Sequence, residues 1–396
     1  MQYKTNTPPP HLFVLIIIIS FAAMCSIFVS PTLPAIANQF KIQNNEVQNI
    51  ATYFVIGYLL GQLIYAPLIK GFGVKKALNF GVVICFIGTI ACYLSYFFNT
   101  FELLKYGRLI TGVGSGVGFV TIYSTINNIY YEADARKITS YTSLSFVLVP
   151  GIAMVLSGVI VTHIGWQYCF LFLSLWSYFI YALGKNLPET VPTAKLEKIN
   201  MKSLLTNYYQ VMSKKILVYG LMYGVAASAF YIYVATGPLI IISNLNKSAE
   251  YYATSNLIVI FGYVLGGIYS IRTSHKESAH SILLGCVIMS ISSVVLSIAH
   301  QLNYFNTPIL FFIIFAAIYF SVPMLFSNIS VLLLSNSTEK STVSSILGFL
   351  HLVPPLFFLK IMGTSTQPSA LLPLILCMMS ITLMLLNVIS RKMKKA

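Results

Sequence analysis

Twelve long apolar runs follow one another along this chain of 396 residues. A helix of about 20 apolar residues spans the hydrocarbon core of a bilayer, which is about 30 Å thick. The runs are continuous, whereas the strands of a membrane barrel alternate in polarity. Because unpaired backbone is costly in lipid, the pattern predicts an all-α membrane protein with twelve transmembrane helices. The runs lie near residues 12–32, 47–69, 78–98, 104–127, 141–162, 166–187, 216–240, 251–271, 281–299, 307–334, 341–363 and 369–389.

The composition excludes a soluble protein. Only 8% of the residues are charged and 57% are hydrophobic, whereas soluble proteins have about 25% charged residues. The net charge of +15 reflects 9 acidic against 24 basic residues. In a soluble protein this balance would suggest nucleic acid, but in a membrane protein it is typical of basic cytoplasmic loops. The predicted partner is therefore the lipid bilayer, and we expect no binding to nucleic acid.

The basic residues predict the orientation of the chain in the membrane. With the N-terminus in the cytoplasm, 19 of the 24 Lys and Arg fall on the cytoplasmic side of a twelve-helix map, as the positive-inside rule requires. An even number of helices then places both termini in the cytoplasm. The first run, preceded by Lys4, has the look of a signal peptide, but its length of about 19 residues favours an uncleaved transmembrane helix.

An apolar stretch that turns abruptly basic occurs twice. "GYLLGQLIYAPLIKGFGVKKA" begins at Gly57, and "GYVLGGIYSIRTSHK" begins at Gly262, in the second run of each half. We therefore expect a duplicated unit: an N-terminal six-helix bundle over 1–187, a polar central loop over 188–215 and a C-terminal six-helix bundle over 216–396. Parallel repeats of this kind enclose a binding site near the bilayer midplane, which indicates a transporter that works by alternating access.

The titratable residues restrict how such a transporter is driven. The predicted helices carry no deep carboxylate, although proton-coupled exporters usually hold one. Arg108 lies about one turn inside the fourth run, either as a functional residue that tunes a neighbour or binds an anion, or as an arginine that snorkels or ties helices together. His351 lies near mid-depth of the eleventh run, either as a proton carrier or as a packing histidine. The lack of acids argues against a strongly cationic substrate.

Aromatic faces on two runs are candidate walls of the binding site, because amphipathic ligands are held by apolar surfaces with a few polar groups. The alternative is that these side chains only pack helices together or anchor the membrane interface. The face on the second run is Tyr58, Gln62 and Tyr65, and that on the seventh is Tyr219, Tyr223, Phe230 and Tyr233.

The sequence offers no sign of an enzyme, a cofactor or a metal site. The six cysteines lie inside apolar runs without metal-ligand spacing. No cluster of His, Asp and Glu and no nucleophile elbow is present. We expect the cysteines to be small packing residues.

Several motifs together resemble the major facilitator superfamily, and more narrowly the Bcr/CflA group of twelve-span drug exporters. They are "FVSPTLPAIANQF", "NEVQNIATYFVIGYLLGQLIYAPL", "GFGVKKA", "GRLITGVGSGVG", "GWQYCFLF", "LPET" and "YVATGPL". The resemblance implies a monomeric proton antiporter of the bacterial inner membrane that exports drugs. It also assigns a role in proton coupling to Arg108, the basic residue of the span-four motif. Gating roles fall to Gly73 in the loop after the second span and to Pro150 and Gly151 in the fifth span.

The chain departs from this pattern at two positions. The family's loop after the second span carries an acid that caps a helix and locks the two halves, and Lys70 stands there instead. The carboxylate that commonly ends the first span is replaced by an apolar residue near Ile27. The first change predicts either a weakened inner gate or a lock made by other residues.

The sequence therefore predicts a secondary transporter for a small neutral, zwitterionic or anionic compound, drug-like or a secreted metabolite such as a siderophore. Proton-coupled export is the leading interpretation. The alternatives are an uptake symporter or uniporter for a nutrient, and a non-transporting membrane sensor.

Overall fold

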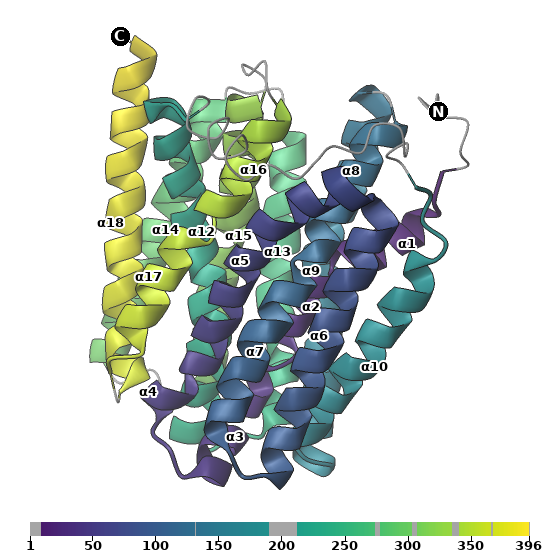
Figure 1. The fold of residues 1–396 in the computed structure, drawn as a ribbon. Helices are drawn as coiled ribbons and strands as arrows, with labels where there is room; N and C mark the ends of the chain where they lie inside the picture. Colours follow the sequence, from purple (N-terminus) through teal and green to yellow (C-terminus); the bar gives the residue numbers. More distant parts are fainter. Residues whose placement is uncertain are drawn as a thin grey trace. The chain divides into compact units, whose positions relative to one another are not determined.

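The computed structural model describes residues 9–130, 132–189, 212–273, 278–302, 307–334, 340–365 and 367–395. These residues form helices and no β-strand, as the apolar runs predicted (Figure 1). The helices up to the central segment are α1 (Leu12–Ile19), α2 (Phe21–Ile27), η1 (Ser30–Thr32), α3 (Leu33–Phe40), α4 (Asn44–Val47), α5 (Asn49–Phe72), α6 (Val74–Phe97), α7 (Phe101–Ser115), α8 (Val117–Ile129), α9 (Glu132–His163) and α10 (Gln167–Gly184). The helices after it are α12 (Lys214–Pro238), the π-helix η3 (Leu239–Asn244), α13 (Ala249–Arg272), α14 (Ser278–Gln301), α15 (Pro308–Leu334), α16 (Lys340–Leu350), α17 (Val353–Met362) and α18 (Pro368–Lys395).

The chain divides into two compact units. Of the described residues, the first unit contains 9–40 and 49–189, and the second contains 41–48 and everything from 212 onward. The short helix α4 therefore belongs to the second unit, although it lies between α3 and α5 in the sequence.

Within the described residues, ten helical segments are long and apolar enough to cross a membrane. Each lies on one of the twelve predicted runs, and shorter apolar helices, Gly151–His163 and Ile346–Met362, lie on the other two. The ten are Phe21–Phe40, Asn44–Phe72, Val74–Phe97, Phe101–Ile126, Gln167–Gly184, Lys214–Asn244, Ala249–Arg272, Ser278–Gln301, Pro308–Ser330 and Ser369–Met393. An all-α multi-pass membrane protein is thus confirmed, while the count of twelve spans stays a prediction.

The first run differs from the single helix that we expected. It is divided into α1, α2 and η1, and α3 follows it; the segment able to span a membrane begins only at Phe21 and ends at Phe40. The hydroxyl of Ser20 donates to the carbonyl of Ile17 at 2.9 Å, beside the first break. Pro31 and Pro34 then remove two backbone donors around the 3₁₀ turn.

The repeated glycines make equivalent contacts in the two units. In the first unit a Cβ atom on Gly57 of α5 would overlap the carbonyl of Leu109 on α7. In the second unit a Cβ atom on Gly262 of α13 would overlap the carbonyl of Ala316 on α15. Each glycine thus brings two helix backbones into direct contact, as small residues do in membranes. This shared contact supports the duplication that the sequence indicated.

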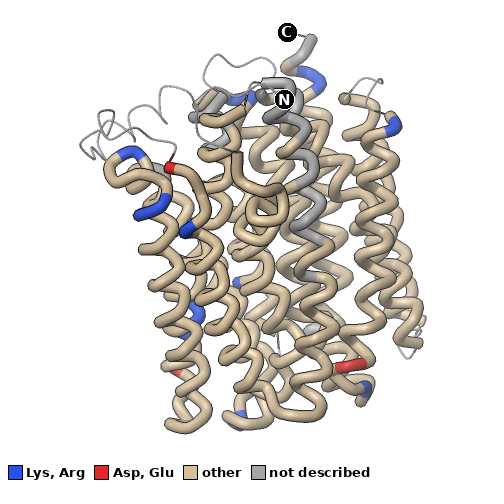
Figure 2. The backbone as a smooth tube through the Cα atoms, turned by 90° about the vertical axis from the view of Figure 1, so that its right-hand side faces the viewer, with Lys and Arg blue, Asp and Glu red and all other residues tan. Residues whose placement is uncertain are grey.

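Charged residues lie mainly toward the ends of the helices, and the long stretches between them are nearly free of charge (Figure 2). In the first unit, a basic cluster of Lys70, Lys75, Lys76 and Lys185 lies where α5 ends, α6 begins and α10 ends. In the second unit, Arg391 of α18 donates to the carbonyl of Ala279 on α14 at 3.4 Å, so these ends also lie together.

Candidate functional site

A carboxylate caps the start of α6, in the loop that the family resemblance assigns to gating. Gly73 has φ of +87° between α5 and α6, a backbone conformation that glycine tolerates best. One oxygen of Glu189, Oε1, accepts from the backbone amide of Val74 at 2.8 Å, and Oε2 accepts from that of Lys75 at 3.2 Å. The amides of a first helical turn have no partner within the helix, so a carboxylate stabilises them by hydrogen bonds and by charge.

Glu189 thus caps a helix of its own unit, whereas the acid of the family pattern would lock the two halves. Lys70 itself is exposed in the last turn of α5. The Nζ of Lys75 also donates to the carbonyl of Lys185 at 3.3 Å, which further joins α6 to the end of α10. The sequence motif "LPET" contained Glu189, but 115 residues separate it from Val74, so no local pattern pointed to this contact.

Arg108 is buried inside the first unit, with 2% of its surface exposed. Its Nη1 donates to the carbonyl of Cys25 at 3.0 Å, and its guanidinium lies 4.4 Å from the centre of the Phe54 ring. Cys25 is in the last turn of α2, whose carbonyls lack partners within the helix. Arg108 therefore ties α7 to α2 as a C-terminal cap, and among the described residues it forms no ion pair.

One face of α5 presents buried polar atoms. Tyr58 is 5% exposed and Tyr65 is fully buried, and both lie on the face that the sequence predicted. The hydroxyl of Tyr65 is buried and has no hydrogen-bond partner among the described residues, and the buried Nε2 of Gln62 lies toward Tyr58. Because buried polar atoms are nearly always paired, the Tyr65 hydroxyl is a candidate for contact with a ligand.

His351 lies at a break in a helix of the second unit. α16 ends at Leu350 and α17 begins at Val353. Pro354 and Pro355 have no amide hydrogen, so the carbonyls one turn earlier lose their usual partners. The Nδ1 of His351 lies 2.6 Å from the carbonyl of Gly348. A carbonyl only accepts, so Nδ1 carries the proton and Nε2 is left as an acceptor.

Tyr223 of α12 lies next to this helix break. Its ring stacks on Phe326 of α15 with centroids 4.1 Å apart, and the edge-to-face distance to the His351 ring is 6.2 Å. A Cβ atom on Gly224 would lie 2.5 Å from the carbonyl of Leu350. The glycine thus lets α12 approach the broken segment closely, which places the predicted Tyr223 beside the predicted His351.

Tyr233 lies apart from this pair, in an aromatic cluster on α12, α13 and α15. Its hydroxyl donates to Oδ1 of Asn256 at 2.8 Å, and its ring lies 4.7 Å from that of Phe315 and 5.6 Å from that of Tyr319. Phe230 reaches the same Tyr319 ring at 6.4 Å. Sequence reasoning did not identify Phe315 or Tyr319, because nothing local marks which residues of a uniformly apolar run face inward.

The remaining predicted residues are placed as follows. Tyr219 is buried on α12, one turn before Tyr223. Gly151 is buried within α9. Pro150 belongs to the same helix, but its side chain lies outside the described part of the structure.

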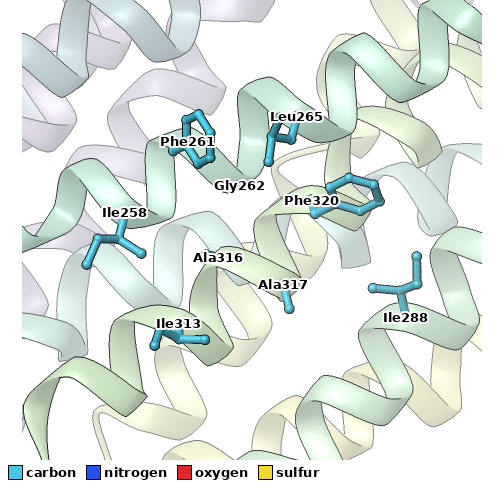
Figure 3. Close-up of a pocket in the computed structure, with 9 residues that line it drawn as sticks. All are labelled: Ile258, Phe261, Gly262, Leu265, Ile288, Ile313, Ala316, Ala317 and Phe320. Atoms are coloured by element: carbon cyan, nitrogen blue, oxygen red, sulfur yellow. The ribbon is translucent and has the colours of Figure 1, made fainter.

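An open groove runs over α13, α14 and α15, with a volume of about 320 Å³ (Figure 3). Phe261, Leu265, Phe320 and three isoleucines surround a floor of Gly262, Ala316 and Ala317. None of these residues carries a polar side chain, so the groove can hold an apolar chain but cannot orient a polar substrate.

No group of three or more His, Cys, Asp or Glu side chains is arranged to hold a metal ion within the described residues.

Comparison with known proteins places this geometry in a family. The family model of the Major Facilitator Superfamily matches residues 15–358. An uncharacterized transporter of Rickettsia felis is 23% identical over 299 residues, which are 69% of this chain and 72% of that protein. Multidrug resistance protein D of Escherichia coli is 22% identical over 182 residues, 46% of this chain and 45% of its own length. Chloramphenicol resistance protein CraA of Acinetobacter baumannii is 21% identical over 272 residues, 68% and 64% of the two chains.

Among solved structures, that of a D-xylose-proton symporter superposes with a TM-score of 0.74 at 14% identity and covers 96% of both chains. At this identity the likeness concerns the fold alone. With a matching family model over most of its length and the same fold, the chain belongs to the Major Facilitator Superfamily.

Proposed function

We propose that this protein is a secondary active transporter that exports a small organic compound across a bacterial inner membrane by alternating access, in exchange for protons. The proposal of transport rests on membership of the superfamily. Export is favoured by the names of two relatives, a multidrug resistance protein and a chloramphenicol resistance protein. The same two relatives support the proposal that this protein is similar to the Bcr/CflA exporters.

The proposed topology has twelve spans with both termini in the cytoplasm. Ten long helices and two shorter apolar ones supply the spans. The basic cluster at the Glu189 end of the first unit favours the cytoplasm on that side, since Lys and Arg concentrate in cytoplasmic loops. We take the functional form to be a monomer of two six-helix bundles.

The charges favour a neutral, zwitterionic or anionic substrate. In the described spans, acidic side chains occur only in first turns, at Glu46, Glu102 and Glu250. A strongly cationic substrate would leave its charge without a carboxylate in a medium where unpaired charge is costly. Gln62 and Tyr65 offer an amide donor and a hydroxyl to such a substrate, and Tyr58 offers an aromatic wall.

His351 is the proposed proton carrier. It is an imidazole at a helix break, and because Nδ1 is bonded to the Gly348 carbonyl, Nε2 is the nitrogen that would take up the proton. In this proposal, Tyr223 shields the ring, and movement of the two short helices α16 and α17 exposes Nε2 to one side or the other. Arg108 contributes by holding α2 and α7 together, and Gly73 with its Glu189 cap stabilises the inner gate.

Proton flux in proteoliposomes tests this function. An imposed pH gradient is followed with a fluorescent dye while chloramphenicol or another neutral amphipathic compound is added, for wild type, His351→Ala and the control His163→Ala. His163 lies exposed at the end of α9. Collapse of the gradient in wild type and His163→Ala, but not in His351→Ala, is the expected result. Substrate movement without proton flux in wild type would overturn proton coupling, and flux retained in His351→Ala would overturn the role of this histidine.

A further inference from the structure

Two thiols from distant parts of the sequence lie in contact in the core of the first unit. The sulfurs of Cys25 on α2 and Cys85 on α6 are 3.8 Å apart, and both side chains are fully buried. The hydroxyl oxygen of Ser177 on α10 lies 3.6 Å from the Cys85 sulfur. The sequence gives no metal-ligand spacing because 60 residues separate the two cysteines.

A buried positive charge lies beside this pair, without an anionic partner among the described residues. It is the guanidinium of Arg108, whose Nη1 donates to the backbone carbonyl of Cys25 itself at 3.0 Å. Its Nε is buried and has no hydrogen-bond partner within the described residues. An arginine that is buried without a carboxylate favours any ligand that brings negative charge to its surroundings.

We infer that Cys25 and Cys85 form a two-coordinate site for a monovalent soft metal ion, Cu⁺ or Ag⁺. Thiolates are the ligands that such ions prefer. Binding converts two thiols and one metal ion into a bis-thiolate complex of charge −1 and releases two protons. The complex and the Arg108 guanidinium then sum to zero, whereas the guanidinium with two neutral thiols carries +1.

The separation of the sulfurs suits a bridging metal better than a disulfide. With the zinc–thiolate bond length of about 2.3 Å as a guide, an ion between sulfurs 3.8 Å apart would have an S–metal–S angle of about 110°. Opening to a linear arrangement moves the sulfurs apart by about 0.8 Å. A disulfide bond of about 2.05 Å would need them to approach by about 1.8 Å, against the packing of α2 and α6.

Silver binding tests the site. Purified protein is dialysed against Ag⁺ in chloride-free buffer with glutathione as a competitor, so that single cysteines do not retain metal. Wild type and the control Cys286→Ser, a buried cysteine of the second unit, are expected to retain one Ag⁺ per chain. Cys25→Ser and Cys85→Ser are expected to bind about 100-fold more weakly, because the second thiolate acts at high effective concentration. Arg108→Gln is expected to weaken binding more than Arg108→Lys.

A second measurement uses wild type alone, so it remains valid even if the cysteine variants fail to fold. Thiol alkylation in mild denaturant, read by mass spectrometry, should show that Ag⁺ protects Cys25 and Cys85 together and leaves Cys286 reactive. Absence of retained Ag⁺ in wild type, or equal protection of all three cysteines, would overturn the inference. Neither readout depends on transport, so the result is separate from that of the proton-flux experiment.

Discussion

Removal of the Glu189 carboxylate should lower the free energy of local opening at the start of α6, by an amount that follows from the two hydrogen bonds that are lost. Glu189→Ala leaves the amides of Val74 and Lys75 without their acceptor. A hydrogen bond contributes about 0.5–1.5 kcal/mol net, and Glu189 is exposed to solvent, so we place each bond at the lower end of this range. The two together then stabilise this turn by about 1–2 kcal/mol, the size of an ordinary helix-cap loss. A local free energy of that size corresponds to about 5–30-fold faster amide exchange.

Hydrogen–deuterium exchange on a peptide covering residues 70–80, with the protein in nanodiscs, measures this effect. Glu189→Gln keeps one carbonyl acceptor but no charge, so we expect about half of the free-energy change. Glu102→Ala is the matched control: it removes an exposed carboxylate of the same unit, paired with Lys105 on α7, and should leave the peptide unchanged. Exchange at the start of α6 within about twofold of wild type in Glu189→Ala would refute the capping role.

Three further predictions concern packing and the ligand site. Gly266→Ala should reduce the yield of monodisperse protein on gel filtration, because its Cβ atom would overlap the Phe320 carbonyl at a cost of about 1–3 kcal/mol. A Cβ atom at the adjacent Gly267 would meet nothing within 4 Å, so the control Gly267→Ala should leave the yield unchanged. Tyr65→Phe removes a hydroxyl without a partner, so the melting temperature should hold or rise while the KM for transport rises about tenfold if substrate binds there. Tyr223→Ala should lower the substrate-driven proton flux by exposing His351, and unchanged kinetics would remove this ring from the proposed path.

The sequence alone determined the class of the protein and much of its architecture. Each apolar run can be recognised as a transmembrane helix from its own residues. The reason is that insertion of a helix into lipid depends on local composition and on backbone hydrogen bonds within the segment. For the same reason the repeat around Gly57 and Gly262 was visible as a pattern, and the family followed from motifs within single spans. The individual side chains at the proposed site, such as Tyr65 and His351, could be proposed only as members of helix faces.

Only the tertiary structure decided which distant residues meet. Glu189 reaches Val74 across 115 residues, and the Cys25 sulfur meets that of Cys85 across 60. The breaks at Ser20 and His351 likewise interrupt runs whose hydropathy is continuous. In a chain that is apolar almost throughout, hydrophobic periodicity carries little information about which face is buried, since lipid and protein interior are equally apolar. The partners are therefore set by close packing, at glycines such as Gly57 and Gly224, and by the few polar groups that must find one another.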